Sequence, residues 1–368
     1  MSDQQFDIWP IVIDWGQGTK PDCQQMAQLK TWLAASGQAD VWQTAADLLQ
    51  MTLDSRGRLL QSFVQQLNTD GVTLPLAGNW TDWVEPLWQL WLPLAQYIDS
   101  QQRALNTPYI QGILGGQGTG KSTLSQILQM LLRCLGQQAV ALSIDDLYLT
   151  YAERCELQRT DPRLVWRGPP GTHDVALGVK ILTQIRQGAM AIQLPRFDKS
   201  LKGGQGDRTQ PLIVHHPTVV LFEGWCVGAR PLPESLLSGD DFVFPDPIKT
   251  PADRQFAKDC NRKLADYLPL WSFLHSLIVL KPEDYRWALQ WRQAAEYKMI
   301  AKGKAGLSKT EISAFVLYFW KALHPELFIT PLTVSPSTSD ASDSRLTYKT
   351  SLVVNICRNQ QVGSLCLP

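Results

Sequence analysis

Apolar side chains at helical spacing dominate the first hundred residues. They recur at three- and four-residue intervals over 23–35, 41–49 and 59–67, which places them on one face of a helix in each segment. Four tryptophans between residues 80 and 91 are typical of packing residues rather than of a ligand platform. The pattern predicts a helical N-terminal extension over residues 1–105, and no motif that carries chemistry is visible there.

The pattern changes at Tyr109, where short apolar runs begin to alternate with helical stretches. Because parallel strands are joined through helices, this alternation is typical of an α/β domain with a mainly parallel, doubly wound sheet flanked by helices. We predict such a domain over residues 106–368, with a surface loop at the polar segment 335–344. The strands are predicted at 109–114, 139–144, 218–222, 274–280 and 352–356, and the helices at 123–135, 179–186, 282–301 and 309–323.

The segment Gly-Gly-Gln-Gly-Thr-Gly-Lys-Ser at residues 115–122 matches the phosphate-binding pattern G-x-x-x-x-G-K-[ST] and lies between a predicted strand and a predicted helix. Glycines let the backbone wrap around phosphate oxygens, and N–H groups at the helix start offer a positive site. We predict that Lys121 reaches the β- and γ-phosphates and that Ser122 binds Mg²⁺. A plain glycine-rich turn is the alternative. The predicted nucleotide contacts are Gly115, Gly116, Gln117, Gly118, Thr119, Gly120, Lys121, Ser122 and Thr123.

An aspartate pair, Asp145 and Asp146, follows the next predicted strand. The helix from Lys121 is about 22 Å long at about 1.5 Å per residue, and the strand 139–144 returns about 20 Å at about 3.3 Å per residue. The pair therefore comes back beside the phosphate loop, at the carboxyl end of the sheet. There a carboxylate can accept the proton of a substrate hydroxyl or hold a metal-bound water. Asp145 is the predicted base, although either aspartate could instead cap the following helix.

The apolar run 218–222 ends in Glu223 and Gly224, as a buried central strand does when it delivers a carboxylate to a metal region. We predict that Glu223 acts on the metal side, together with Ser122 and Asp145. A strand-end glutamate that faces solvent is the alternative. The chain has no N-K-x-D tetrapeptide for reading guanine, and GTPases and motor ATPases more usually place an aspartate at this strand end. Both observations point away from switches and motors.

Two irregular loops between the second and third predicted strands gather basic residues near the phosphate site. They cover residues 166–174 and 194–208. Loops over a rigid scaffold often carry recognition, and a small anionic acceptor is best held by guanidinium groups. Solvated loop charge is the alternative for each member, and His173 could instead brace its loop. The predicted acceptor contacts are Asp145, Tyr148, Arg167, His173, Asp174, Arg196, Lys199 and Arg208.

A basic helix followed by glycines is predicted to form a lid over about residues 285–310. It contains the run W-R-Q-A-A-E at 291–296, and four lysines lie between residues 298 and 309. A lid that closes over phosphates excludes water and adds positive charge as the γ-phosphoryl group moves. Arg292 is the predicted catalytic member of this lid. The alternative is a solvated helix face.

Composition narrows the classes of function. The chain of 368 residues carries 34 basic and 34 acidic residues, so no global field draws it to nucleic acid or to an anionic membrane, and neither is a predicted partner. Seven scattered cysteines without a CxxC pair indicate reduced thiols. The segment Met1–Pro10 lacks the features of a signal or transit peptide. We therefore expect a cytoplasmic protein.

These motifs resemble those of the P-loop kinases that include phosphoribulokinase, uridine kinase and bacterial pantothenate kinase, and within them the plant and cyanobacterial D-glycerate 3-kinases. The resemblance spans roughly residues 105–330. Its general part is the phosphate loop, the aspartate pair and the strand end at Glu223. Its particular part consists of R-G-x-x-G-x-H-D at 167–174, P-R-F-D-K-S at 195–200, G-x-G-D-R at 204–208 and W-R-x-x-A-E at 291–296.

The resemblance implies a P-loop kinase fold and a transfer of phosphate from ATP with Mg²⁺ to D-glycerate, which yields 3-phosphoglycerate and closes photorespiratory salvage. In this family the aspartate that matches Asp145 serves as the base, and the I-x-R-N run at 356–359 lies near the adenine. A kinase of a nucleoside or of pantothenate is an alternative within the class, and an NTP-hydrolysing switch is an alternative outside it. The oligomeric state is left open.

Overall fold

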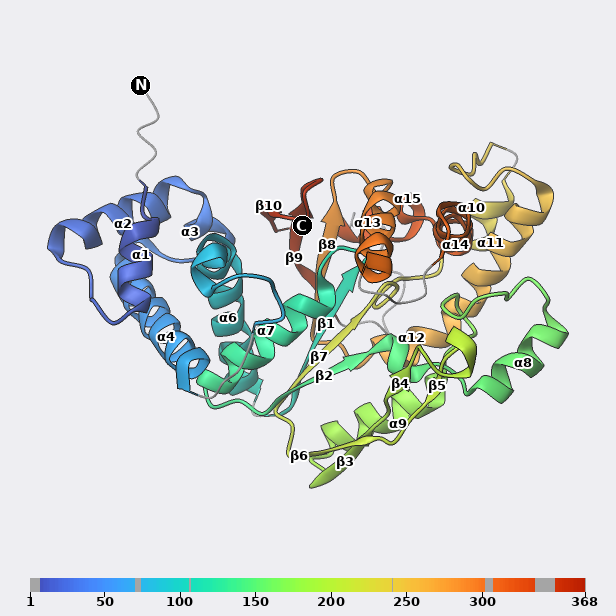
Figure 1. The fold of residues 1–368 in the computed structure, drawn as a ribbon, viewed down its shortest axis with the longest axis horizontal. Helices are drawn as coiled ribbons and strands as arrows, with labels where there is room; N and C mark the ends of the chain where they lie inside the picture. Colours follow the sequence, from blue (N-terminus) through green and yellow to red (C-terminus); the bar gives the residue numbers. More distant parts are fainter. Residues whose placement is uncertain are drawn as a thin grey trace. The chain divides into compact units, whose positions relative to one another are not determined.

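The computed structural model describes residues 7–69, 74–105, 107–239, 241–301, 307–334 and 348–367. Contacts divide the chain into two compact units. One consists of Met1–Tyr109 and Ser122–Val140, and the other consists of Ile110–Lys121 and Ala141–Pro368. Figure 1 shows the elements of each unit. Within the described ranges, no helix combines the length and the apolar character needed to cross a membrane.

The first unit is built from helices, as the spacing of its apolar residues predicts. These helices are α1 (Trp9–Gly16), α2 (Cys23–Ala35), α3 (Gln38–Val41), α4 (Leu49–Thr69), α5 (Val84–Pro86), α6 (Leu92–Leu105) and α7 (Lys121–Cys134). Trp88 is fully buried, and its ring lies 5.9 Å from that of Trp15. Gly57 of α4 leaves room for Trp15, because a side chain there would overlap the indole ring. Trp88 and Trp91, both buried, are therefore packing residues.

The helix predicted at 41–49 is wrong. Helix α3 ends at Val41, a turn with Gln43 at φ +50° follows, and a 3-10 turn at Ala46–Leu48 leads into α4. A positive φ is uncommon for residues with a side chain and cannot continue a right-handed helix. The apolar spacing that suggested one helix is thus shared among three successive elements.

The second unit contains the predicted sheet, which has six strands in the order β10-β9-β8-β1-β7-β2. Strand β8 pairs in parallel with β1 and β9, whereas β10 pairs antiparallel with β9. Every residue of β1 and β7 is buried, as in central strands covered on both faces. The prediction of a mainly parallel sheet is confirmed. The strands are β1 (Tyr109–Gly115), β2 (Ala139–Ser143), β7 (Val219–Gly224), β8 (Ser276–Pro282), β9 (Lys349–Ile356) and β10 (Val362–Cys366).

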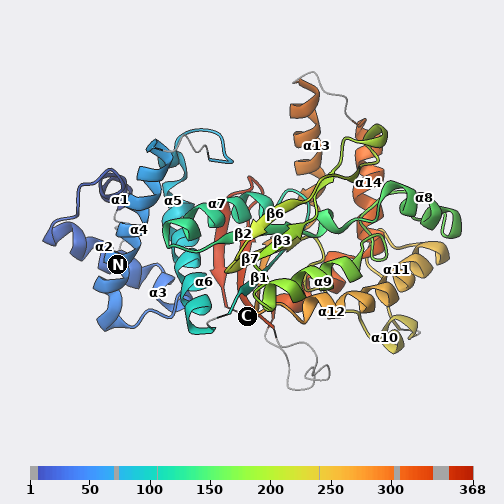
Figure 2. The ribbon, with the colours of Figure 1, turned by 90° about the horizontal axis from the view of Figure 1, so that it is seen from below.

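Eight helices of the described residues belong to the second unit. Helix α9 packs against α12, and α14 packs against both α11 and α13; Figure 2 shows these neighbours. The helix predicted at 282–301 begins five residues later, at Trp287, because β8 runs through Pro282. The eight are α8 (Tyr151–Thr160), α9 (Val175–Arg186), α10 (Glu234–Ser238), α11 (Pro251–Leu264), α12 (Leu268–Trp271), α13 (Trp287–Ala301), α14 (Lys309–Ala322) and α15 (Pro325–Phe328).

Two small strand pairs lie within and beside the loop that was predicted at 194–208. Strands β3 (Ala191–Leu194) and β6 (Leu212–His215) pair antiparallel, and so do β4 (Phe197–Asp198) and β5 (Asp207–Arg208). Strand β10 was also missed. The loop predicted at 335–344 lies outside the described residues, as do Lys302, Gly303, Lys304 and Gly306 of the predicted lid.

Candidate active site

The phosphate-binding loop leaves β1 as a tight turn. Gly118 and Gly120 adopt φ angles of +80° and +84°, which glycine reaches without steric cost. The hydroxyl of Thr119 donates to the carbonyl oxygen of Gly116 at 2.9 Å, and a side chain at Gly115 would overlap Thr119. Helix α7 begins at Lys121, directly after this turn. The loop therefore has the compact glycine conformation and the helix start that suit a phosphate cradle.

Two distant segments hold the loop at Gly118. The side-chain amide of Gln360 donates to the Gly118 carbonyl at 2.7 Å, and Trp291 lies so close that a side chain at position 118 would meet it at 2.8 Å. The indole N–H of Trp291 in turn donates to the carbonyl of Arg358 at 2.8 Å. The family resemblance implied that 356–359 lies near the adenine, but Gln360, which lies 242 residues from its partner, was missed.

The aspartate pair lies on a 3-10 turn at Ile144–Leu147, directly after β2. Asp146 is a structural residue: its carboxylate accepts from the backbone amide of Ser143 at 3.2 Å and from the guanidinium of Arg196 at 3.1 Å. Asp146 thus closes the capping box of its own 3-10 turn, whereas the following helix α8, which an aspartate was expected to cap as the alternative, is capped by Thr150. Asp145 has a different environment, because its Oδ2 lies 2.6 Å from Nζ of Lys199.

The pKa values of Asp145 and Asp146 are shifted in opposite directions. Burial favours the neutral form of Asp145, but the charge and hydrogen bond of Lys199, the hydroxyl of Tyr148 and the charge of Lys121 outweigh it, so the pKa of Asp145 is lowered. Burial raises the pKa of Asp146 despite the opposing charge of Arg196. Asp145 is thus held as a carboxylate beside the ammonium of Lys199.

The hairpin of β4 and β5 carries Lys199 to Asp145. Arg208 fixes this hairpin: its Nε donates to the carbonyl of Tyr148 at 2.9 Å, and its Nη2 bonds to Asp174 at 3.0 Å. Asp174 also caps α9 by accepting from the amide of Leu177 at 2.9 Å. Of the predicted acceptor contacts, Arg208, Asp174 and Arg196 therefore make structural bonds here.

Two arginines lie over the same hairpin. Nη1 of Arg167 donates to the carbonyls of Gly204 and Gln205 at 3.0 and 2.9 Å, and its guanidinium lies 5.9 Å from the ring centre of Tyr148. Arg154, which no motif singled out, donates to the carbonyls of Leu149 and Gln205. Arg167 thus lies beside the ring of Tyr148, whereas the guanidinium of Arg154 lies 5.1 Å from the ring centre of Phe197.

Tyr148 and His173 form a buried aromatic pair next to Asp145. Their rings stack with centroids 4.7 Å apart. Burial, reinforced by the negative charge of Asp145, raises the pKa of Tyr148 far above its usual value. Burial lowers the pKa of His173 to about 4, although the charge of Asp145 acts in the other direction. The imidazole is thus neutral at physiological pH, and its Nδ1 lies 2.7 Å from the hydroxyl of Tyr267, a residue that sequence reasoning missed.

Glu223 lies at the carboxyl end of β7 with 6% of its surface exposed, so the alternative of a solvent-facing glutamate is wrong. Among the described residues, no group of three or more His, Cys, Asp and Glu side chains is arranged to hold a metal ion. Cys226, three residues further along, is buried, and burial followed by the charge of Asp145 raises the pKa of its thiol. This thiol is not poised to react as a thiolate.

Arg292, the predicted catalytic residue of the lid, makes its contacts with residues of α13 and α14. Its Nη2 bonds to Glu296 at 2.8 Å, and its guanidinium lies 5.7 Å from the ring centre of Phe315 on α14. Glu296 is 3% exposed and also accepts from the backbone amide of Leu307 at 2.9 Å. In this conformation Arg292 ties α13 to α14, and a role on the γ-phosphate stays a prediction.

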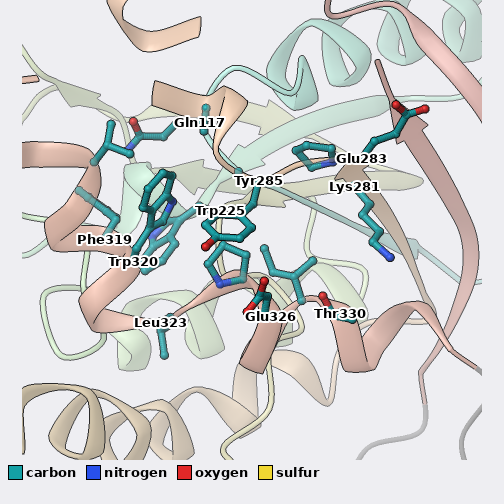
Figure 3. A pocket seen from close by; sticks show the side chains of 16 residues that line it. Gln117, Trp225, Lys281, Glu283, Tyr285, Phe319, Trp320, Leu323, Glu326 and Thr330 are labelled. Atoms are coloured by element: carbon teal, nitrogen blue, oxygen red, sulfur yellow. The ribbon is translucent and has the colours of Figure 1, made fainter. Parts of the chain in front are cut away.

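A cavity of about 330 Å³ borders the loop on the side of α14 and α15. Figure 3 shows its aromatic walls, among them Trp225, Tyr285 and Trp320, with Gln117 at one end. Trp225 also packs edge-on against Phe319, with ring centres 4.9 Å apart. The described residues that line this cavity include neither Asp145 nor Lys199. The cavity is thus distinct from the charged cluster at the end of β2.

Comparison with known proteins assigns the chain to a family. No protein-family model matches it. The uncharacterized kinase mug58 of Schizosaccharomyces pombe is 32% identical over 240 residues, which cover 61% of this chain and 83% of that protein. The chain belongs to the family of this kinase. The chloroplastic D-glycerate 3-kinase of Arabidopsis thaliana is also similar to it, with 29% identity over 298 residues that cover 75% of this chain and 60% of the plant protein.

A solved structure also supports the assignment of this kinase to its family. D-glycerate 3-kinase from Cryptococcus neoformans matches it with a TM-score of 0.65 and 25% identity, over 76% of this chain and 99% of that one. The predicted P-loop kinase fold is confirmed, and so is the homology to D-glycerate 3-kinases. The protein is an ATP-dependent kinase of a small molecule.

Proposed function

We propose that this kinase transfers the γ-phosphoryl group of ATP to D-glycerate and forms 3-phosphoglycerate and ADP. The observation that carries the proposal is the Asp145–Lys199 pair, 2.6 Å apart, at the end of the strand that follows the phosphate loop in sequence. A carboxylate at this place can orient an acceptor hydroxyl, and the ammonium beside it can receive an acceptor carboxylate. The similarity to D-glycerate 3-kinases from a plant and a fungus supports this choice of acceptor.

Phosphoryl transfer asks mainly for placement and for neutralisation of charge. We assign the ATP phosphates to residues 115–123, with Lys121 on the β- and γ-phosphates. Asp145 accepts the hydrogen bond of the acceptor hydroxyl and aims its oxygen at the γ-phosphorus. Its lowered pKa makes it a weak base, which is sufficient for a loose transition state in which little proton transfer precedes bond cleavage.

Mg²⁺ suits the donor groups that the sequence singled out. Ser122, Glu223 and Asp145 offer hydroxyl and carboxylate oxygens, which are the ligands that this hard cation prefers. When bound, Mg²⁺ would neutralise charge on the phosphates. Glu223, buried at the end of β7, would then serve to orient the shell around the ion. Asp145 can join that shell when Lys199 releases it.

The acceptor is held by the hairpin and the loop before α9. Glycerate is small, anionic and rich in hydroxyl groups, so it needs positive and hydrogen-bonding partners within a short reach. Lys199, Arg167, Tyr148 and His173 gather around Asp145 and supply such groups. The cavity bordered by α14 and α15 has mostly apolar and aromatic walls, which suit glycerate less well.

The proposal extends to the organisation and setting of the kinase. We assign catalysis to residues 106–368, with residues 285–310 as the lid and residues 1–105 as an extension. All seven cysteines lie in the described residues and are thiols, which suits a reducing compartment such as the cytoplasm. In a photosynthetic cell the reaction would complete the salvage of photorespiratory glycerate.

A panel of acceptors tests the proposal. Coupled ADP release is measured with Mg·ATP alone and with D-glycerate, L-glycerate, uridine or pantothenate added. Release that requires D-glycerate supports the assignment. ADP release that depends on uridine or pantothenate instead would identify the protein as a kinase of that acceptor. Equal release without any acceptor would identify it as an NTPase.

A further inference from the structure

Tyr267 is fully buried, lies outside every recognised motif and places its hydroxyl under the acceptor loop. The oxygen accepts from the backbone amide of Gly171 at 3.0 Å. Nδ1 of the His173 ring lies 2.7 Å from the same oxygen. Tyr267 therefore touches both ends of the short segment that presents His173.

These contacts determine where the protons are. The Gly171 amide already donates to the Tyr267 oxygen, and among the described residues the group in hydrogen-bond range that can accept the proton of this buried phenol is Nδ1 of His173. A neutral imidazole carries one proton. Because Nδ1 accepts, that proton must sit on Nε2. Burial raises the pKa of Tyr267 far above its usual value and so keeps the phenol protonated and able to donate.

The Nε2–H group that results is buried and lacks a partner among the described residues. The His173 side chain is 5% exposed, its ring stacks on Tyr148, and the negative charge of Asp145 acts on both rings. A buried donor is normally satisfied by a partner. An oxygen of a bound acceptor would satisfy the Nε2–H group of His173, close to the negative charge of the proposed base Asp145.

We propose that Tyr267 is a positioning residue that holds His173 in the Nε2–H tautomer, so that this N–H donates to an oxygen of the acceptor beside Asp145. The inference rests on the proposed function for the identity of the acceptor, a hydroxy acid. It adds a specificity rule, since a neutral N–H donor selects a hydroxyl or carboxylate oxygen and rejects an ammonium group. The competing role is purely structural, with Tyr267 and His173 bracing residues 167–174.

The tautomer is measured directly by NMR on the wild-type protein. The ring nitrogen shifts of His173 at pH 7.5 tell which nitrogen carries the proton, and the chain has five histidines, so the spectrum of His173→Gln assigns the signal. We expect a protonated Nε2 and an unprotonated Nδ1, with a shift of the Nε2–H signal when the acceptor binds. A proton on Nδ1, or an imidazolium, would overturn the proposal.

Kinetics separate positioning from bracing. Tyr267→Phe keeps the buried ring and removes the hydroxyl, so the KM for the acceptor should rise by about tenfold while the KM for ATP changes less than about twofold. His173→Gln can still present an amide donor and should retain more acceptor affinity than His173→Leu. Equal acceptor affinity in the last two variants, or a loss in Tyr267→Phe that appears in thermal stability alone, would contradict the proposal.

The same variants keep this inference distinct from the choice of D-glycerate. If the wild-type kinase ignores D-glycerate but phosphorylates another acceptor, the proposed substrate fails, and Tyr267→Phe should still raise the KM for that other acceptor. If D-glycerate is the substrate and its KM is unchanged in Tyr267→Phe, the positioning role fails and the proposed function stands.

Discussion

Nζ of Lys199 lies 2.6 Å from Oδ2 of Asp145, and this ion pair joins the β4–β5 hairpin to the end of β2. The lysine side chain is 60% exposed, whereas that of the aspartate is 28% exposed. The more exposed partner is the one that an incoming anion can draw away. We expect the acceptor carboxylate to take the ammonium of Lys199, which leaves the Asp145 carboxylate to bind the acceptor hydroxyl.

Replacing Lys199 tests this exchange. Lys199→Met keeps the length of the side chain and removes its charge, so kcat/KM for the acceptor should fall by about 10- to 100-fold, the range for a lost charge-assisted hydrogen bond. The KM for ATP should change little. Steady-state kinetics with each substrate varied in turn provides the measurement.

Lys202 offers a matched control for that variant. It lies in the same hairpin, with its ammonium 5.9 Å from the ring centre of Tyr151. Lys202→Met should leave kcat/KM within about twofold of the wild-type value, as is usual for a surface change. An equal loss in both variants would mean that the hairpin's overall charge matters and that the pair with Asp145 does not.

Lys121 should be indispensable for turnover. Its ammonium neutralises charge that develops on the phosphates, so Lys121→Ala should lower kcat by on the order of 10²–10³-fold or more. The fold should persist, which circular dichroism and thermal unfolding check. Lys180→Ala, at an exposed position of α9, serves as the control. Near-normal activity of Lys121→Ala would refute the assignment of the phosphate loop.

Gln360 should tune nucleotide binding through the loop. Its side chain holds the Gly118 carbonyl at 2.7 Å, so Gln360→Ala should raise the KM for ATP by about fivefold, with a smaller effect on kcat. The neighbouring Gln361, whose side chain bonds to Asn359, gives the control variant Gln361→Ala. An unchanged KM for ATP in Gln360→Ala would show that the contact does not position the loop.

Much of the site follows from local sequence. The phosphate loop, Asp145 and Glu223 each sit where a strand ends, and strand ends are marked by the change from an apolar run to polar or glycine residues. Helix α2 begins where the sequence indicates, because Asp22 and Gln25 form a local capping box. Signals of this kind can be recognised from a few adjacent residues, without knowledge of distant partners.

The rest depends on partners far apart in the chain. Tyr267 lies 94 residues from His173, and Gln360 lies 242 residues from Gly118, so no local pattern connects either pair. Strands β4 and β5 have two residues each, which is too short for an alternating pattern. Arg196 and Arg208 read as acceptor ligands because their charge is visible in the sequence, whereas their bonds to Asp146 and Asp174 are not.

An ion pair between two helices should make stability depend on pH. Lys321 of α14 bonds to Asp253 of α11 at 2.7 Å. Burial opposes ionisation of Asp253, but the hydrogen bonds of Lys321 and Thr250 lower its pKa to about 2. Its stabilising effect is therefore complete above its unfolded-state pKa near 4 and is lost as the pH falls toward 2.

Asp253→Asn should thus lower the free energy of unfolding by about 2 kcal/mol at pH 7 and by about half as much at pH 3. Urea unfolding of both proteins at the two pH values measures the difference. Asp266→Asn, at an exposed position, should stay within about 0.5 kcal/mol of the wild type. A deficit that is equal at pH 7 and pH 3 would show that the charge of Asp253 is not its source.

The most direct test of the account compares D-glycerate-dependent ADP release by the wild-type kinase and by Asp145→Asn. Asparagine keeps the shape of the side chain but is a far poorer acceptor for the substrate's proton. We predict that ADP release by the wild type requires D-glycerate, and that kcat falls by about 10²–10⁴-fold in the variant with a smaller change in ATP affinity. A wild-type rate that is indifferent to D-glycerate, or a variant whose kcat survives, would contradict the central claim.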